Sequence, residues 1–176
     1  MIAARFAPIV AAAREGRRMD LNPAQTKVLE MLIRHEELLS QLYGMYAMKL
    51  SRRHAFWYGL AMDEKSHADW LRTLMFLDFG EGTLFDEKRF DLEVIQASIE
   101  LARARLNEVE SKTLYPFIAV STALEMEQAM IERKYFEVCA GDGEEFRRIM
   151  ETLAAQTKTH VDKLLQEQAT LEQEEE

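Results

Sequence analysis

Five polar residues interrupt apolar stretches of this 176-residue sequence, and their types are those that bind metal ions in proteins. Around each one, apolar residues recur three or four positions apart, which is the spacing of the buried face of a helix. A charged carboxylate in such an interior is unfavourable unless it is paired, protonated or bound to a metal. A metal site explains all five together, because cations neutralise carboxylates and neutral imidazoles supply nitrogen ligands. The candidate ligands are Glu36, Glu64, His67, Glu127 and His160.

A diverged internal repeat supports a site made of two related halves. Residues 63–71 (DEKSHADWL) and 156–164 (QTKTHVDKL) share lysine, histidine, aspartate and leucine in register. Glu64 and His67 are three residues apart, which places both on one face of a helix. The repeat also contains a departure, because Thr157 stands where the first copy has Glu64. A near two-fold arrangement of this kind suits a two-metal site between two helical pairs.

The elements that position these residues are predicted to be helices, since the sequence has seven glycines, three prolines and few strand-like alternations. Asn22 and Pro23 are typical of a helix start, with a capping side chain followed by proline at the first helical position. Apolar spacing and glycine-containing stops predict four long helices and one shorter amphipathic helix. The long helices are expected at about 23–49, 51–80, 113–139 and 144–168, and the shorter one at about 91–107.

Short connections join the first two long helices and the last two, so each pair is expected to form an antiparallel hairpin. About thirty residues, including the shorter helix, separate the two hairpins. Two hairpins joined by one long crossover form the ferritin-like version of the four-helix bundle. We therefore expect an all-α chain with an N-terminal arm at 1–20, the bundle at 21–170, and an acidic, frayed C-terminal tail at 171–176.

Four stretches of the sequence form one pattern: Glu36 followed by Tyr43 and Ala47, Asp63-Glu64-x-x-His67, Ala123-Leu124-Glu125-Met126-Glu127, and the stretch from Leu153 to His160. On these residues the chain resembles the rubrerythrin-type branch of the ferritin-like di-iron carboxylate proteins, over about residues 21–168. The resemblance implies a ferritin-like bundle, a pair of iron ions, and a reaction that reduces peroxide or oxygen or oxidises iron(II).

The resemblance also implies a role for each ligand. Glu64 would bridge the two metals, and Thr157 would leave the second bridging position without a carboxylate. With three carboxylates the site should hold its second ion more weakly and disfavour iron(III). Three alternatives follow for the number of metals: two ions, one ion in a half-site with Glu64, or no functional metal. Divalent metals other than iron are also possible at this site. The terminal ligands would be Glu36 and His67 at one metal, and Glu127 and His160 at the other.

Two functions of different classes fit these residues. The first is a non-haem iron protein of oxidoreductase type, with peroxide, oxygen or iron(II) as its small substrate. The sequence has one cysteine, Cys139, and therefore no CxxC pairs for the rubredoxin-like iron module of rubrerythrins, so a redox cycle would need an external electron donor. The alternative, which Thr157 favours, is a non-catalytic metal-binding or helical interaction module with a degenerate site. A homodimer is expected in either case.

Composition bears on partners and location. The net charge of −9 argues against a generic grip on the nucleic acid backbone. No apolar run approaches the roughly 18 residues that a membrane-spanning helix needs. Acidic charge and a single cysteine suit the cytoplasm. Residues 1–18 carry a formal charge of +3 and are expected to pack on the bundle or on a partner subunit, with a membrane-surface or targeting role as the alternative.

The remaining polar and aromatic residues receive structural interpretations. Tyr43 and Trp57 are expected to pack in the core, and for Tyr43 a redox role is the alternative. Gln156, one turn before a candidate histidine ligand, is a weak candidate for a further oxygen ligand. His35 and His54 have no partners in register, so both are expected at the surface.

Overall fold

A computed structural model describes residues 21–76 and 84–175, and every regular element within them is a helix. This confirms the all-α fold class over the described part of the chain. The expected arm at 1–20 and the glycine-containing stop at 80–82 lie outside the described residues. The elements are α2 (Pro23–Lys49), η2 (Ser51–Arg53), α3 (His54–Leu74), η3 (Glu87–Arg89), α4 (Leu92–Ser111), α5 (Pro116–Glu132) and α6 (Glu144–Glu175).

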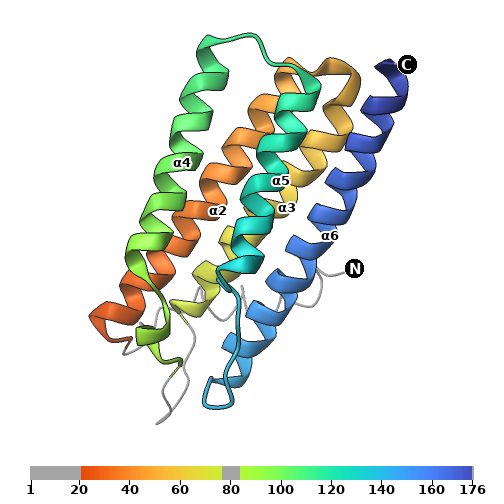
Figure 1. Ribbon diagram of the computed structural model, residues 1–176. Coiled ribbons are helices and arrows are strands. Elements are labelled where there is room, and N and C mark those ends of the chain that lie inside the picture. The colour runs from red at the N-terminus through yellow and green to blue at the C-terminus, as the bar shows by residue number, and fades with distance from the viewer. Residues whose placement is uncertain (1–20, 77–83, 176) are drawn as a thin grey trace.

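Two helical hairpins and a helical crossover make up the bundle (Figure 1). Helices α2 and α3 form one antiparallel pair, and α5 and α6 form the other. In the sequence between the two pairs, α4 runs along α2 in the same direction, so that α5 begins near the end of the bundle where α2 stops. The all-helical structure is consistent with the predicted helical bundle, and the crossover is itself one of its long helices.

The start of α2 follows the sequence prediction. The Asn22 side chain accepts a hydrogen bond from the Gln25 backbone N–H at 2.8 Å, and the Gln25 side chain accepts one from the Asn22 N–H at 3.2 Å. This reciprocal capping satisfies two donors that the first turn of a helix would otherwise leave unpaired. Gln25 also donates to the Phe85 carbonyl at 2.7 Å, which ties the start of α2 to the segment before α4.

The crossover helix is longer than predicted. It spans Leu92–Ser111, 20 residues, where the sequence predicts 91–107, and so reaches about 30 Å. No glycine or proline stops it after residue 107, and Val109 is buried. Lys49 donates to the carbonyls of Val109 and, at 2.8 Å, of Lys112, where a helix presents its partial negative charge.

Helix α5 is shorter than the predicted span of 113–139. It begins at Pro116 because the residue before a proline is driven out of the helical region, and Tyr115 is extended with φ −99° and ψ 140°. It ends at Glu132, shortly before Lys134 adopts a left-handed φ of 55°. Tyr135 then packs into the core from an irregular segment, so the apolar residues beyond Glu132 are not part of a helix.

Two further helix ends differ from the prediction. Helix α3 stops at Leu74 instead of near residue 80, and α6 continues to Glu175 instead of ending near residue 168. The helix thus continues into the expected acidic tail, and Arg53, the residue before α3, pairs with Glu167 at 2.5 Å and Glu174 at 2.6 Å. These contacts hold the last turns of α6 against the first hairpin.

Aromatic side chains fill the core on both sides of a polar layer. Near the C-terminal end of α2, Tyr46 and Trp57 meet edge to face with ring centroids 4.9 Å apart, and both are buried, as predicted for Trp57. Near the other end, Phe85 stacks on Phe146 at 4.5 Å. Between these layers, α2 presents Glu36 to the interior. The apolar layers therefore enclose a carboxylate at mid-height.

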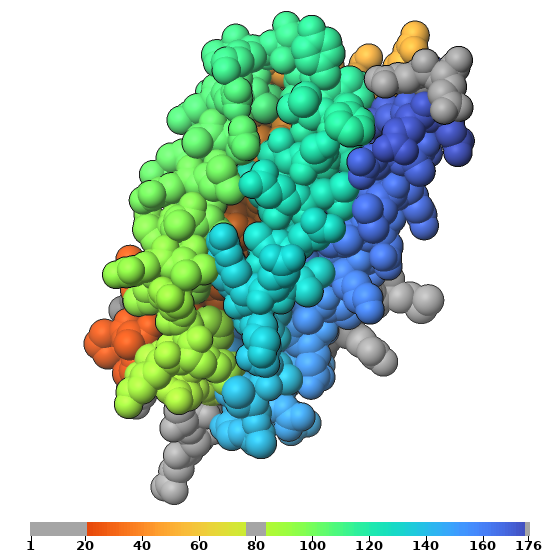
Figure 2. All heavy atoms as spheres, viewed as in Figure 1, coloured from red at the N-terminus to blue at the C-terminus, as the bar shows by residue number. Residues whose placement is uncertain are grey.

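The face formed by α4 and α5 is seen in Figure 2, with atoms of α2 visible between them. A pocket of about 290 Å³ lies among these three helices and is lined in part by His35, Ser98 and Arg133. None of the helices in the described part of the chain combines the length and the apolar character needed to cross a membrane.

Candidate metal centre

All five candidate ligands lie in the interior, each with at most 1% of its surface exposed. They come from the four helices that surround the core: one each from α2, α5 and α6, and two from α3. Their ligand atoms form two groups in which all atoms lie within 4.8 Å of one another. Glu64 belongs to both groups. The groups are Glu36, Glu64 and His67, and Glu64, Glu127 and His160.

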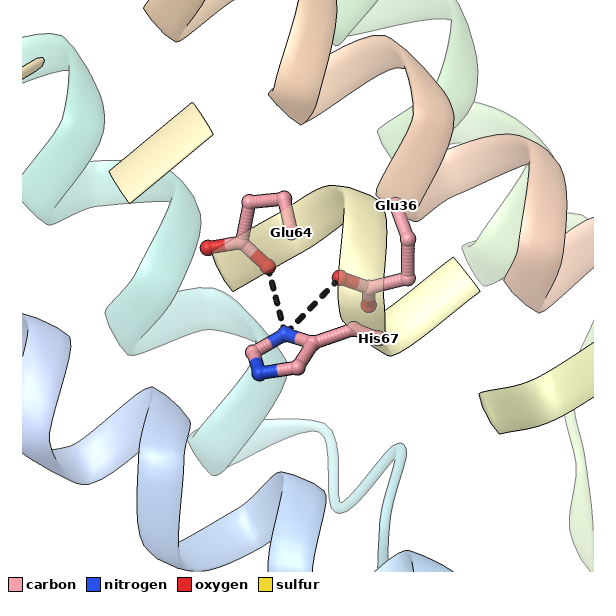
Figure 3. A group of neighbouring side chains, drawn as sticks. All are labelled: Glu36, Glu64 and His67. Atoms are coloured by element: carbon pink, nitrogen blue, oxygen red, sulfur yellow. Dashed lines mark hydrogen bonds and ion pairs between the residues drawn. The ribbon is translucent and has the colours of Figure 1, made fainter. Parts of the chain in front are cut away.

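The first group belongs entirely to the α2–α3 hairpin (Figure 3). His67 Nδ1 lies 2.6 Å from Glu64 Oε2 and 3.5 Å from Glu36 Oε2. The carboxylates of Glu64 and Glu36 both point at this one ring nitrogen, as Figure 3 shows. Three ligand atoms from two helices therefore converge on one small volume.

The second group joins the two hairpins. His160 Nδ1 lies 2.8 Å from Glu64 Oε1 and 3.6 Å from Glu127 Oε1. Glu64 thus turns one carboxylate oxygen toward each histidine. The rings of His67 and His160 face each other with centroids 5.5 Å apart and 22° between their planes. The two groups therefore share one carboxylate, and each could hold a metal ion.

Several buried polar atoms of the cluster make no hydrogen bond, although buried polar atoms in proteins are normally paired. Glu64 Oε1 and His160 Nδ1, for example, lie 2.8 Å apart without the direction that a hydrogen bond requires. Carboxylate oxygens and imidazole nitrogens aimed at common points form a donor set that fits divalent cations. The atoms without a partner are Glu36 Oε2, Glu64 Oε1, Glu127 Oε2 and His160 Nδ1.

Contacts outside the cluster orient its two histidines. His67 Nε2 donates to Gln156 Oε1 at 2.6 Å, and His160 Nε2 lies 3.3 Å from Asp63 Oδ2. Both rings are therefore held with Nδ1 toward the carboxylates. Gln156 contacts a ring nitrogen, and a role for Asp63 is not predicted from the sequence. The signal that could have identified both was the repeat, in which each stands four residues before a histidine.

Tyr43 and Thr157 complete the buried polar layer. Tyr43 is buried as predicted, and its hydroxyl donates to Glu127 Oε1 at 2.8 Å. Thr157 is also buried, with 1% exposure, at the position of the repeat where α3 has Glu64. A hydroxyl thus occupies an interior position that a second bridging carboxylate would need.

Burial and mutual charge shift the protonation of the cluster. Burial raises the pKa of Glu36 to about 8 and, together with the Glu64 charge, that of Glu127 to about 7. Burial opposes ionisation of Glu64 as well, but His67 and His160 outweigh it and hold the pKa of Glu64 well below its usual value. The pKa of each histidine is raised despite burial: Glu64 and Glu36 raise that of His67, and Asp63 and the nearby glutamates raise that of His160 to about 12.

The two remaining histidines differ from one another. His35 is buried with 2% exposure, so its predicted surface position is wrong. Its ring meets the edge of Tyr135 at 5.8 Å, and burial lowers its pKa to about 4. The partner comes from the irregular segment after α5, which residue spacing does not reveal. His54 is exposed, as predicted.

No protein-family model, curated protein or solved structure matches this chain in comparisons with known proteins. The function is therefore inferred from the chemistry of the buried site and from the helices that carry it.

Proposed function

We propose that this chain is a non-haem di-iron protein of oxidoreductase type, with a ferritin-like bundle of the rubrerythrin kind. The observation that carries the proposal is the position of Glu64, whose two carboxylate oxygens face two different histidines. Each histidine also has a second glutamate within 3.6 Å. Carboxylate-rich sites with one nitrogen ligand per ion are well suited to iron.

Two iron(II) ions held at this site would supply, one electron from each, the two electrons that reduce peroxide to water. Glu36 and His67 would hold one ion from the α2–α3 hairpin, and Glu127 and His160 the other from the α5–α6 hairpin. Glu64 would contact both. The surrounding apolar and aromatic side chains exclude bulk water, which strengthens every electrostatic interaction within the site.

Peroxide reduction also consumes two protons, and the hydroxyl group beside one candidate ligand keeps its own proton instead of supplying one of them. The Tyr43 hydroxyl donates to Glu127 Oε1 at 2.8 Å and is fully buried. Burial raises the pKa of Tyr43 well above its usual value, so this hydroxyl keeps its proton and holds Glu127 in place. Return of the two irons to iron(II) would need electrons from a separate donor. The sequence has one cysteine, Cys139, and therefore no CxxC pairs for a rubredoxin-like electron-transfer module.

Thr157 favours a second candidate function, a metal-binding module without redox turnover. With Thr157 in place of a bridging carboxylate, three glutamates bear three negative charges against the four positive charges of two divalent ions. A site with fewer anionic oxygens disfavours the more highly charged iron(III). In that case the cluster holds a divalent ion and joins the hairpins, without cycling between oxidation states.

The first test is the iron content per chain, measured by elemental analysis on protein purified anaerobically after iron supplementation. We expect about two irons per chain, and a loss of both in Glu64→Gln, because that carboxylate serves both positions. Glu125→Gln provides the matched control, since Glu125 lies on α5 near Glu127 but is exposed. Peroxide and oxygen consumption by the loaded protein then separates the two candidate functions.

Each outcome of this test has a definite meaning. About two irons together with peroxide or oxygen turnover supports the oxidoreductase. Metal without turnover, or about one ion per chain, supports the binding module. An iron content no higher than that of Glu64→Gln, in protein with an intact helical circular dichroism spectrum, refutes both.

A further inference from the structure

The two histidines of the cluster are supported by residues of different charge. His67 Nε2 donates to the neutral amide of Gln156 at 2.6 Å, and His160 Nε2 lies 3.3 Å from the carboxylate of Asp63. Each support comes from the helix that carries the other histidine, so α3 and α6 exchange contacts. Because Gln156 and Asp63 are equivalent in the repeat, the two halves of the site differ here by one charge.

These contacts act on a bound ion through the imidazole ring. A ring that donates through Nε2 presents the lone pair of Nδ1 to the ion. A carboxylate acceptor makes the ring a more basic ligand than an amide does, and it adds a negative charge near the ion. Asp63 should therefore strengthen its histidine as a ligand more than Gln156 strengthens the other.

We infer that Asp63 and Gln156 are positioning residues that make the two metal positions unequal, so that the position at His160 binds a divalent cation more tightly than the position at His67. This inference rests on the proposed metal site. It adds an order of occupation, with the ion that joins the two hairpins bound first and the ion within the α2–α3 hairpin bound second.

Two contacts oppose this order, and both are weaker. Lys163 Nζ lies 3.4 Å from Asp63 Oδ2 and offsets part of its charge, but Asp63 contacts the ring directly whereas Lys163 contacts it only through Asp63. Tyr43 draws charge from Glu127 through its hydrogen bond. A neutral hydroxyl changes the field at the ion less than a full negative charge does.

The order is tested by isolating each position in the full-length chain. Glu127→Gln leaves the position at His67 intact, and Glu36→Gln leaves the position at His160 intact, with little change in side-chain volume. Cobalt(II) is the probe, and its visible absorption bands report binding without any turnover. We expect Glu36→Gln to bind cobalt(II) about tenfold more tightly than Glu127→Gln.

Charge exchange at the supporting residues identifies the cause. Adding Asp63→Asn to Glu36→Gln is expected to weaken cobalt(II) binding about tenfold, and adding Gln156→Glu to Glu127→Gln to strengthen it by a similar factor. Asp69→Asn is the matched control: Asp69 also lies on α3, and it pairs with Lys65 and Arg72 instead of a ligand. This control should leave both affinities unchanged.

The outcomes separate this inference from the proposed function. Equal affinities in the two single-position variants, the reverse order, or an equal effect of Asp69→Asn and Asp63→Asn would each overturn the inference while leaving the metal site in place. Failure of the unmodified chain to bind cobalt(II) would overturn both. Circular dichroism of every variant shows that the helices are intact when affinities are compared.

Discussion

Metal binding should release about three protons per chain at pH 7. Before a cation binds, His67 and His160 each carry a proton beyond the neutral form, because the nearby glutamates raise their pKa values. Glu36, with a pKa of about 8, is mostly protonated, and Glu127, with a pKa of about 7, is about half protonated at this pH. Three carboxylates and two imidazoles that share three protons carry no net charge, which is the favoured state of a buried cluster.

Two divalent cations require all of these ligands in their deprotonated forms, so binding must displace the protons. The combined binding constant for both ions should therefore rise about a thousandfold per pH unit near pH 7. Above about pH 9 the two glutamates have lost most of their protons, and the release should fall to about two, from the histidines. The dependence on pH should weaken in the same range.

Calorimetric titration with zinc, at one pH in buffers of different ionisation enthalpy, measures the number of protons released. Glu36→Gln should reduce the release by about one proton, whereas the exposed Glu125→Gln should not change it. Release of one proton or fewer by the unmodified chain, with two zinc ions bound, would refute this account of the cluster.

Three further predictions concern the same layer. Without metal, the free energy of unfolding should fall as pH rises from about 6.5 to 9. The pKa values of Glu36, Glu127 and both histidines are raised in the folded chain, so the folded chain binds more protons than the unfolded chain over this range. Denaturant titrations in which the free energy of unfolding rises over this range would contradict the prediction. Thr157→Glu should increase iron affinity if the site is a weakened two-metal site, and a decrease measured by competition with a chelator would indicate a specialised role for Thr157. Tyr43→Phe should lower the free energy of unfolding of the metal-free chain by about 1–3 kcal/mol and change its cobalt(II) affinity, because Glu127 loses its buried hydrogen-bond donor. The control is Tyr46→Phe, on the same helix but away from the candidate ligands, which should leave cobalt(II) affinity unchanged. An equal change of affinity in both variants would argue against the role of Tyr43.

The buried cluster of glutamates and histidines could be predicted from the sequence because a charged residue is conspicuous in an apolar helix face. Glu36 and Glu127 stand out for this reason. The structure brings each of them close to Glu64 on α3. The start of α2 could also be predicted from the sequence, because Asn22 caps the first turn through a local hydrogen bond and Pro23 has a fixed φ. Features that depend on neighbouring residues in sequence were thus predicted well.

Features that depend on residues far apart in sequence were missed. The end of α5 is one case, because the left-handed Lys134 carries no glycine signal and the burial of Tyr135 requires the neighbouring helices. His35 is another, since its ring partner is that same tyrosine, 100 positions away. Asp63 was also overlooked, as its contact with His160 exists only once α3 and α6 are side by side. Tertiary packing determines all three.

The two groups of candidate ligands become available at different stages of folding. Glu36, Glu64 and His67 all belong to the first hairpin, so this group can assemble from local contacts as soon as α2 and α3 pair, before the rest of the chain has been synthesised. The group that contains Glu127 and His160 exists only after the second hairpin has docked. If the proposed site binds metal, an ion at this later position would show that the second hairpin has docked on the first.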